Sequence, residues 1–210
     1  MNRREAIVGA IGGVVGFSAV KISVADVSTV ENAQAVLKQL ADARQAATFT
    51  DQAIDRESLD AVFKFGVSAL SHRNEQPWFV SIVQDRELLK AIDSDAKLDS
   101  SKRLSFGGAS AAFIISAAED DSDYQHFAIG GMVERLIIAA TLKGLGVKTV
   151  KAGLDKVNES ADRKKQLQIP DGFNAYVALL IGYEATPTVD GASGATTREL
   201  HTKKFAYIPE

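Results

Sequence analysis

The stretch Ser-His-Arg-Asn-Glu-Gln-Pro-Trp-Phe-Val-Ser-Ile-Val, residues 71–83, joins a polar loop directly to an apolar segment. Residues 78–83 carry the aromatic and β-branched side chains that favour a buried strand. Residues 55–70, just before the loop, predict a helix with Asp55 as its N-cap and a broad apolar face. The loop is either an ordinary turn beside a buried Trp78 or a place where backbone and side chains hold a ligand.

The rest of the chain continues this alternation of helices and buried strands. Strands are predicted at residues 111–117, 147–150 and 175–181, and helices at residues 28–40, 85–92, 127–143 and 155–167. Every strand is apolar on both faces, so helices should cover both sides of the sheet in an α+β or α/β sandwich. The helix at 127–143, which Gly144 and Gly146 should end, is so apolar that we expect it at the centre or in a subunit interface.

Composition narrows the chemistry. The 210 residues suit one domain, their net charge of −3 gives no drive toward nucleic acid, and there is no cysteine. No metal site is predicted, because the three histidines form no short ligand pair and His126, beside Asp121 and Asp123, is interpreted as part of a solvated acidic turn. No Gly-x-Gly-x-x-Gly fingerprint opens a helix after a strand, which argues against a dinucleotide cofactor such as FAD.

The N-terminus is predicted to be a separate signal or membrane-anchor segment, residues 1–27. Arg3-Arg4 precedes an uncharged run over residues 6–20, and Ser23-Val24-Ala25 supplies the small residues of a cleavage site. The adjacent arginines before a glycine-rich apolar run resemble a twin-arginine export signal, with an ordinary secretory signal or an uncleaved anchor as alternatives. We therefore expect an exported protein, periplasmic or membrane-anchored, and a cytoplasmic one if this segment is not a signal.

Four stretches in order resemble the FMN-dependent nitroreductase family. Ser-x-x-Asn-x-Gln-Pro-Trp at 71–78 is similar to its flavin-contacting loop, and 85–89 to the charged helix after its first strand. Residues 129–147 are similar to its central helix with a Gly-Leu-Gly exit, and 169–183 to its final apolar strand with Gly-Tyr. The resemblance spans roughly residues 30–208 of the chain.

This resemblance implies a fold and a cofactor. The fold is α+β, a three-layer sandwich whose central, mainly antiparallel sheet is flanked by helices, in a domain-swapped homodimer built from the domain at 28–210. One FMN would lie at each subunit interface. The residues implied at the flavin are Ser71, His72, Asn74 and Gln76 on one side and Lys151, Ala152 and Gly153 after the third strand, where backbone N–H groups would face flavin N5.

The chain departs from the family at the phosphate. The usual N-terminal cluster of cations is reduced here to Arg44, with Gln45 and Ala47 in place of its serine and second cation. The C-terminal cation is Arg198 or one of the lysines at 203–204, and Arg103 in a basic loop is a further candidate near the flavin ring. A solvated surface position remains the alternative for each of these cations.

Three functions stay open on this basis. The first is an FMN oxidoreductase that reduces a small electrophile, nitroaromatic- or quinone-like, through flavin N5. The second is an FMN enzyme with a specialised substrate. The third is a non-catalytic or flavin-poor dimer, favoured by the reduced phosphate cluster. The electron donor is either NAD(P)H or a membrane or periplasmic redox partner, since NAD(P)H is a cytoplasmic reductant.

Overall fold

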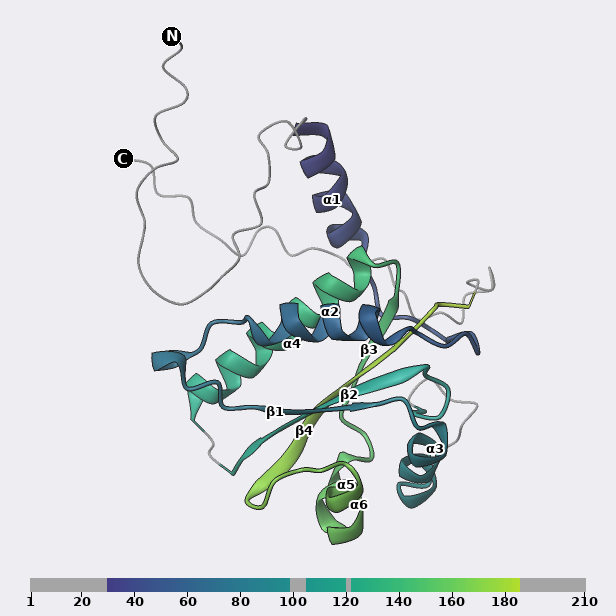
Figure 1. The fold of residues 1–210 in the computed structure, drawn as a ribbon, viewed down its shortest axis with the longest axis vertical. Helices are drawn as coiled ribbons and strands as arrows, with labels where there is room; N and C mark the ends of the chain where they lie inside the picture. The colour runs from purple at the N-terminus through teal and green to yellow at the C-terminus, as the bar shows by residue number, and fades with distance from the viewer. Residues whose placement is uncertain (1–29, 99–104, 120–121, 186–210) are drawn as a thin grey trace, which may run out of the picture. The chain divides into compact units, whose positions relative to one another are not determined.

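The computed structural model describes residues 30–98, 105–119 and 122–185, and within them four strands form one antiparallel sheet in the order β1-β2-β4-β3 (Figure 1). The strands are β1 (Phe79–Val83), β2 (Ala111–Ala118), β3 (Gly146–Val150) and β4 (Phe173–Gly182). Strand β2 is buried on both faces from Ala111 to Ala117. A central strand of this kind needs a covering layer on each side of the sheet.

One face of the sheet packs against α2 (Arg56–Val67) and α4 (Asp123–Leu142). Phe113 and Ile115 of β2 point into this layer, where they meet Leu136 of α4. The two helices approach closely at Gly66, because a Cβ atom there would collide with the side chain of Leu136. The glycine in the middle of α2 is therefore a packing residue, which offsets its poor helix propensity.

The opposite face is covered by α3 (Arg86–Asp95) and α5 (Leu154–Glu159), with α6 (Ala161–Gln166) following α5. Ile92, Ile114 and Leu154 are fully or almost fully buried in this second core. The α+β class, the three layers and the antiparallel sheet expected from the sequence are thus confirmed.

Helix starts follow the capping residues. Asp55 caps α2 by accepting a hydrogen bond from the Ser58 N–H at 2.7 Å, as the sequence predicts. Ser122 caps α4 in the same way, so this helix begins at Asp123, four residues earlier than predicted. The acidic turn around His126 is therefore a wrong interpretation: His126 lies within α4.

Two other boundaries were also wrong. The helix predicted at 155–167 is two short helices, because Ser160 has extended backbone angles and caps the second with its own hydroxyl, which accepts from the Arg163 N–H. Of the two glycines expected to end α4, Gly144 does so with a φ of 73°, whereas Gly146 begins β3. A Cβ at Gly146 would sit 3.1 Å from that of Ala46, so the glycine lets the Ala46 segment approach this edge strand closely.

Helix α1 (Val30–Asp42) crosses the boundary between two compact units, residues 1–35 and 36–210. In the second unit its apolar residues Val36 and Leu37 are exposed among the described residues, whereas Leu40 is half-buried. None of the described helices has the length and hydropathy needed to cross a membrane. The predicted signal or anchor at 1–27 lies outside the described residues.

Candidate functional site

The loop between α2 and β1 is tied together by its own polar groups. The hydroxyl of Ser71 accepts a hydrogen bond from the Gln76 N–H at 2.9 Å, and the Gln76 side-chain amide donates to Asn74 Oδ1 at 3.2 Å. A 3₁₀ turn, η1 (His72–Asn74), lies between them. Three of the predicted site residues therefore shape the loop, while the side chains of Asn74 and Gln76 remain exposed.

This loop is also the most strained backbone in the described part of the chain. Arg73, Asn74 and Gln76 have φ values of 50°, 59° and 47°, and only two other described non-glycine residues have a positive φ. Asparagine tolerates this left-handed region, but arginine and glutamine rarely adopt it. Each such residue costs on the order of 1–3 kcal/mol, and strain of this kind concentrates at ligand-binding loops.

His72 projects from the loop onto the start of α4. Its ring stacks on that of Tyr124, with centroids 4.3 Å apart and an interplanar angle of 21°. A cavity of about 460 Å³ opens beside the pair, within the range of ligand pockets, and is lined by Leu70, Ser71, His72, Asp123, Tyr124 and Phe127. Leu70 and Phe127 are each 80% exposed, so an apolar surface adjoins the predicted flavin loop.

The second predicted group, Lys151 to Gly153, forms the turn from β3 into α5. Gly153 has a φ of 86°, and a Cβ there would lie 3.1 Å from that of Ala96, so this position requires glycine. Gly153 is the N-cap of α5 (Leu154–Glu159). Its backbone N–H donates no hydrogen bond within the described residues. Lys151 is exposed, with its ammonium 4.9 Å from the centre of the Tyr176 ring.

The strand register places these two groups at one end of the sheet. Phe79, the first residue of β1, pairs with Ser116, which in turn pairs with Ala175 near the start of β4. Val150, the last residue of β3, pairs with Ala178, also in the first half of β4. The loop before β1 and the turn after β3 therefore share this end, on opposite edges of the sheet.

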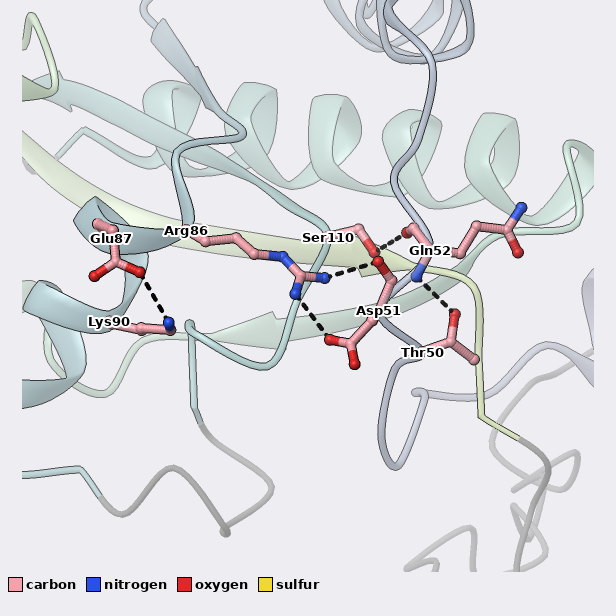
Figure 2. Close-up of polar contacts among 7 residues, drawn as sticks. All are labelled: Thr50, Asp51, Gln52, Arg86, Glu87, Lys90 and Ser110. Carbon is pink, nitrogen blue, oxygen red and sulfur yellow. Dashed lines mark hydrogen bonds and ion pairs between the residues drawn. The ribbon is translucent and has the colours of Figure 1, made fainter.

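Arg44 lies elsewhere. Its neighbour Gln45 bridges to Val147 near the start of β3, which lies at the end of the sheet opposite the loop and the turn. The segment after Gln45 is fixed at this opposite end. Figure 2 shows this anchor: Arg86 donates to the carboxylate of Asp51 at 2.8 Å and to its carbonyl at 3.1 Å. The Arg44 side chain is exposed and has no hydrogen bond or ion pair within the described residues.

The register gives the separation within one chain. Between the first residues of β1 and Gln45, the neighbour of Arg44, there are about 19 Å across four strand spacings and about 20 Å along β4. The structure thus brings Ser71, His72, Asn74 and Gln76 together, places Lys151, Ala152 and Gly153 at the same sheet end, and sets Arg44 apart.

Arg103 and Arg198 lie outside the described residues. Leu98 and Phe106, which flank that segment in the sequence, both pack on Gly153. Sequence reasoning missed Tyr124 and Tyr176, the two rings that contact His72 and Lys151. Tyr176 had a usable signal, since it is a ring with a polar tip in the otherwise apolar run of residues 175–181.

Comparison with solved structures defines the class: the chain has the nitroreductase fold. A nitroreductase with bound FMN from Desulfitobacterium hafniense superposes with a TM-score of 0.68 at 18% identity, over 83% of this chain and 98% of that one. One with bound FMN from Bacteroides fragilis gives 0.67 at 16% identity, with the same coverage.

The sequence itself is similar to a named protein. It is 28% identical over 156 residues, 70% of this chain and 84% of the other, to an Archaeoglobus fulgidus protein provisionally named NADH dehydrogenase/NAD(P)H nitroreductase. No family model matches the chain.

Proposed function

We propose that this protein is an FMN-dependent oxidoreductase that reduces a small electrophile, such as a nitroaromatic or a quinone, through flavin N5. The fold supports this, as do the names of the similar proteins, which describe nitroreductases and, for two solved structures, bound FMN. The observation that carries the proposal is the strained loop at 71–77: three left-handed residues occur where the flavin-contacting motif falls. Arg73 and Gln76 are not residues that turns usually place in this region, and backbone strain of this kind gathers at ligand-binding loops.

The residues present fit a mononucleotide. A flavin with its phosphate needs cations and hydrogen-bond donors. The exposed Asn74 and Gln76 amides, the exposed Arg44 and the Gly153 N–H can supply them. When bound, FMN supplies electron-transfer chemistry at its N5 atom. The chain's part is to orient the flavin with the 71–77 loop and to direct the N–H groups of Ala152 and Gly153 at the reacting edge.

We further propose a homodimer with the flavin between subunits. Arg44 is about 28 Å from the loop of its own chain by strand spacing, longer than a mononucleotide, so we infer that a second copy brings its Arg44 to this loop. The exposed apolar residues on this side, Leu70, Tyr124 and Phe127, are candidates for burial by the partner. Sedimentation at micromolar concentration tests this, and a stable monomer would contradict it.

The identity of the electron donor depends on the cellular compartment in which the protein resides. The name of the Archaeoglobus fulgidus relative suggests NAD(P)H, whereas export through residues 1–27 would require a membrane or periplasmic reductant. N-terminal sequencing of the native protein separates the two: a start near Asp26 supports export, and an intact Met1 in the cytoplasm supports NAD(P)H.

The second candidate is a non-catalytic or flavin-poor dimer, favoured by the lone Arg44 in place of a cation cluster. The absorbance spectrum of purified protein and a titration of apo-protein with FMN distinguish the two. The oxidoreductase should be yellow and quench flavin fluorescence on binding. Colourless protein that binds no added FMN would establish the alternative.

A further inference from the structure

Among the exposed lysines of the described residues, Lys151 is the one whose ammonium lies over an aromatic ring. Lys38, Lys90 and Lys156 each form an ion pair with a carboxylate one turn away on the same helix. The Lys151 ammonium instead lies over the ring of Tyr176 and has no ion pair within the described residues. An aromatic ring holds a cation in place while leaving its charge available to a ligand.

Tyr176 is directed to this position by an irregularity in the sheet. Ile115 pairs with Val177 and Ser116 with Ala175, so Tyr176 is the extra residue of a β-bulge and has no partner on β2. The bulge places both Tyr176 and Val177 against the core beneath α4, which interrupts the usual alternation. Bulges re-aim side chains in this way beside functional sites.

The tyrosine ring is also supported from α4. The ring of His126 stacks on it, with centroids 5.4 Å apart and an interplanar angle of 25°. Tyr176 is half-buried and anchored in a central strand, whereas Lys151 is exposed on the turn after β3. The rigid partner of the pair is therefore the ring, and the ammonium is the part that is positioned.

We propose that Tyr176 is a positioning residue that holds Lys151 as the cation favouring reduced over oxidised flavin, an inference that rests on the proposed FMN function. Reduction by two electrons and one proton, taken up at N5, leaves a negative charge near flavin N1. A cation held beside the flavin binds this reduced form more tightly than the neutral oxidised ring. The tyrosine acts only through the lysine.

The test compares the dissociation constants of oxidised FMN and dithionite-reduced FMN, the latter measured anaerobically, for the full-length protein. Lys151→Met should lower the preference for reduced FMN about tenfold or more, the size of a charge-assisted contact. Each tenfold loss corresponds to a fall of about 30 mV in the two-electron potential. Tyr176→Leu should lower the preference about two- to fivefold, as expected for a cation–π contact.

Matched variants separate positioning from mere packing. Tyr176→Phe keeps the ring and should retain the wild-type preference. Tyr176→Leu should have no further effect in the Lys151→Met background, because the tyrosine acts through the lysine. Equal effects of Tyr176→Phe and Tyr176→Leu, or additive effects in the double variant, would refute the positioning.

The dissociation constant of oxidised FMN for the wild type also distinguishes a failure of this inference from a failure of the proposed FMN function. Failure of the wild type to bind oxidised FMN would overturn the proposed function and the inference together. Tight binding of FMN with an unchanged preference in Lys151→Met would overturn only the role of the Lys151–Tyr176 pair.

Discussion

Asp93 shows how one buried carboxylate fixes a loop. Its oxygens accept hydrogen bonds from the Ser105 hydroxyl at 2.6 Å and from the N–H groups of Phe106 and Gly107 at 2.7 and 2.8 Å. These bonds hold residues 105–107 against α3, and Phe106 in turn packs on Gly153 of the candidate site.

We expect Asp93→Ala to destabilise the fold by about 3 kcal/mol, since two buried donors and one part-buried donor lose their acceptor at roughly 1–3 kcal/mol for each buried one. Asp93→Asn keeps one acceptor oxygen and should cost clearly less. Urea unfolding of both variants measures the difference, and equal losses would show that the carboxylate is not what holds this segment.

A surface ion pair should give a pH-dependent contribution. Arg163 donates to Asp95 at 2.5 Å, and this hydrogen bond lowers the pKa of the Asp95 carboxyl from its ordinary value of 3.8. Because the pKa is lower in the folded state, the stabilisation is fully present above the unfolded value and is lost as the pH falls through the folded one.

Asp95→Asn should therefore be slightly less stable than the wild type at pH 7; the difference should begin to shrink near pH 3.8 and vanish below the lowered pKa of the folded state. Asp171→Asn, which removes an exposed carboxylate without an ion pair in the described chain, is the control. Urea midpoints at a series of pH values test this, and a gap for Asp95→Asn that stays constant across the series would rule it out.

At the scale of elements, the contact between α2 and α4 depends on Gly66. Gly66→Ala gains about 1 kcal/mol of helix propensity but forces its new Cβ into Leu136, at an overpacking cost of about 1–3 kcal/mol. We expect a net destabilisation in the wild type and a gain in a Leu136→Ala background, where the colliding atoms are absent. Denaturant unfolding of this double-mutant cycle measures the coupling, and an equal effect in both backgrounds would contradict it.

Strands and helix caps were predictable because their signals are local. β-Branched runs marked the strands, and Asp55 marked the start of α2. The break at Ser160 was missed because a serine fits either inside a helix or at its cap, and the apolar pattern could not decide between them. The β-bulge at Tyr176 depends on pairing between β2 and β4, which no single segment reveals.

Of the candidate site, the sequence predicted the residues that belong to a recognisable motif, but not how far apart they lie in the fold. The polar pattern at 71–78 located the loop, and Gly153 followed from its place after a strand. The separation of Arg44 from the loop is a property of strand order, with β1 and β3 at opposite edges of the sheet. Two residues that a family resemblance assigns to one site can therefore lie too far apart in one chain to share a site within that chain.

At the scale of the whole molecule, we propose that the site is complete only when two chains combine. Arg44 of one chain would meet the 71–77 loop of the other, so each dimer would hold two composite sites. Arg44→Ala should weaken FMN binding about ten- to a hundredfold, as for a charge-assisted contact. Asn74→Gly removes the loop amide while keeping the left-handed backbone, since glycine adopts the φ of 59° without strain.

Mixed dimers of these two variants test the composite site directly. A heterodimer of an Arg44→Ala chain and an Asn74→Gly chain, purified through two different tags, has one site in which both groups are intact and one in which both are lost. We therefore expect one wild-type-like FMN site for each heterodimer, whereas each variant homodimer has only weakened sites. If Arg44 and Asn74 of the same chain served one flavin, both sites of the heterodimer would be weakened. Fluorescence titration, which counts tight sites by FMN stoichiometry, separates these outcomes.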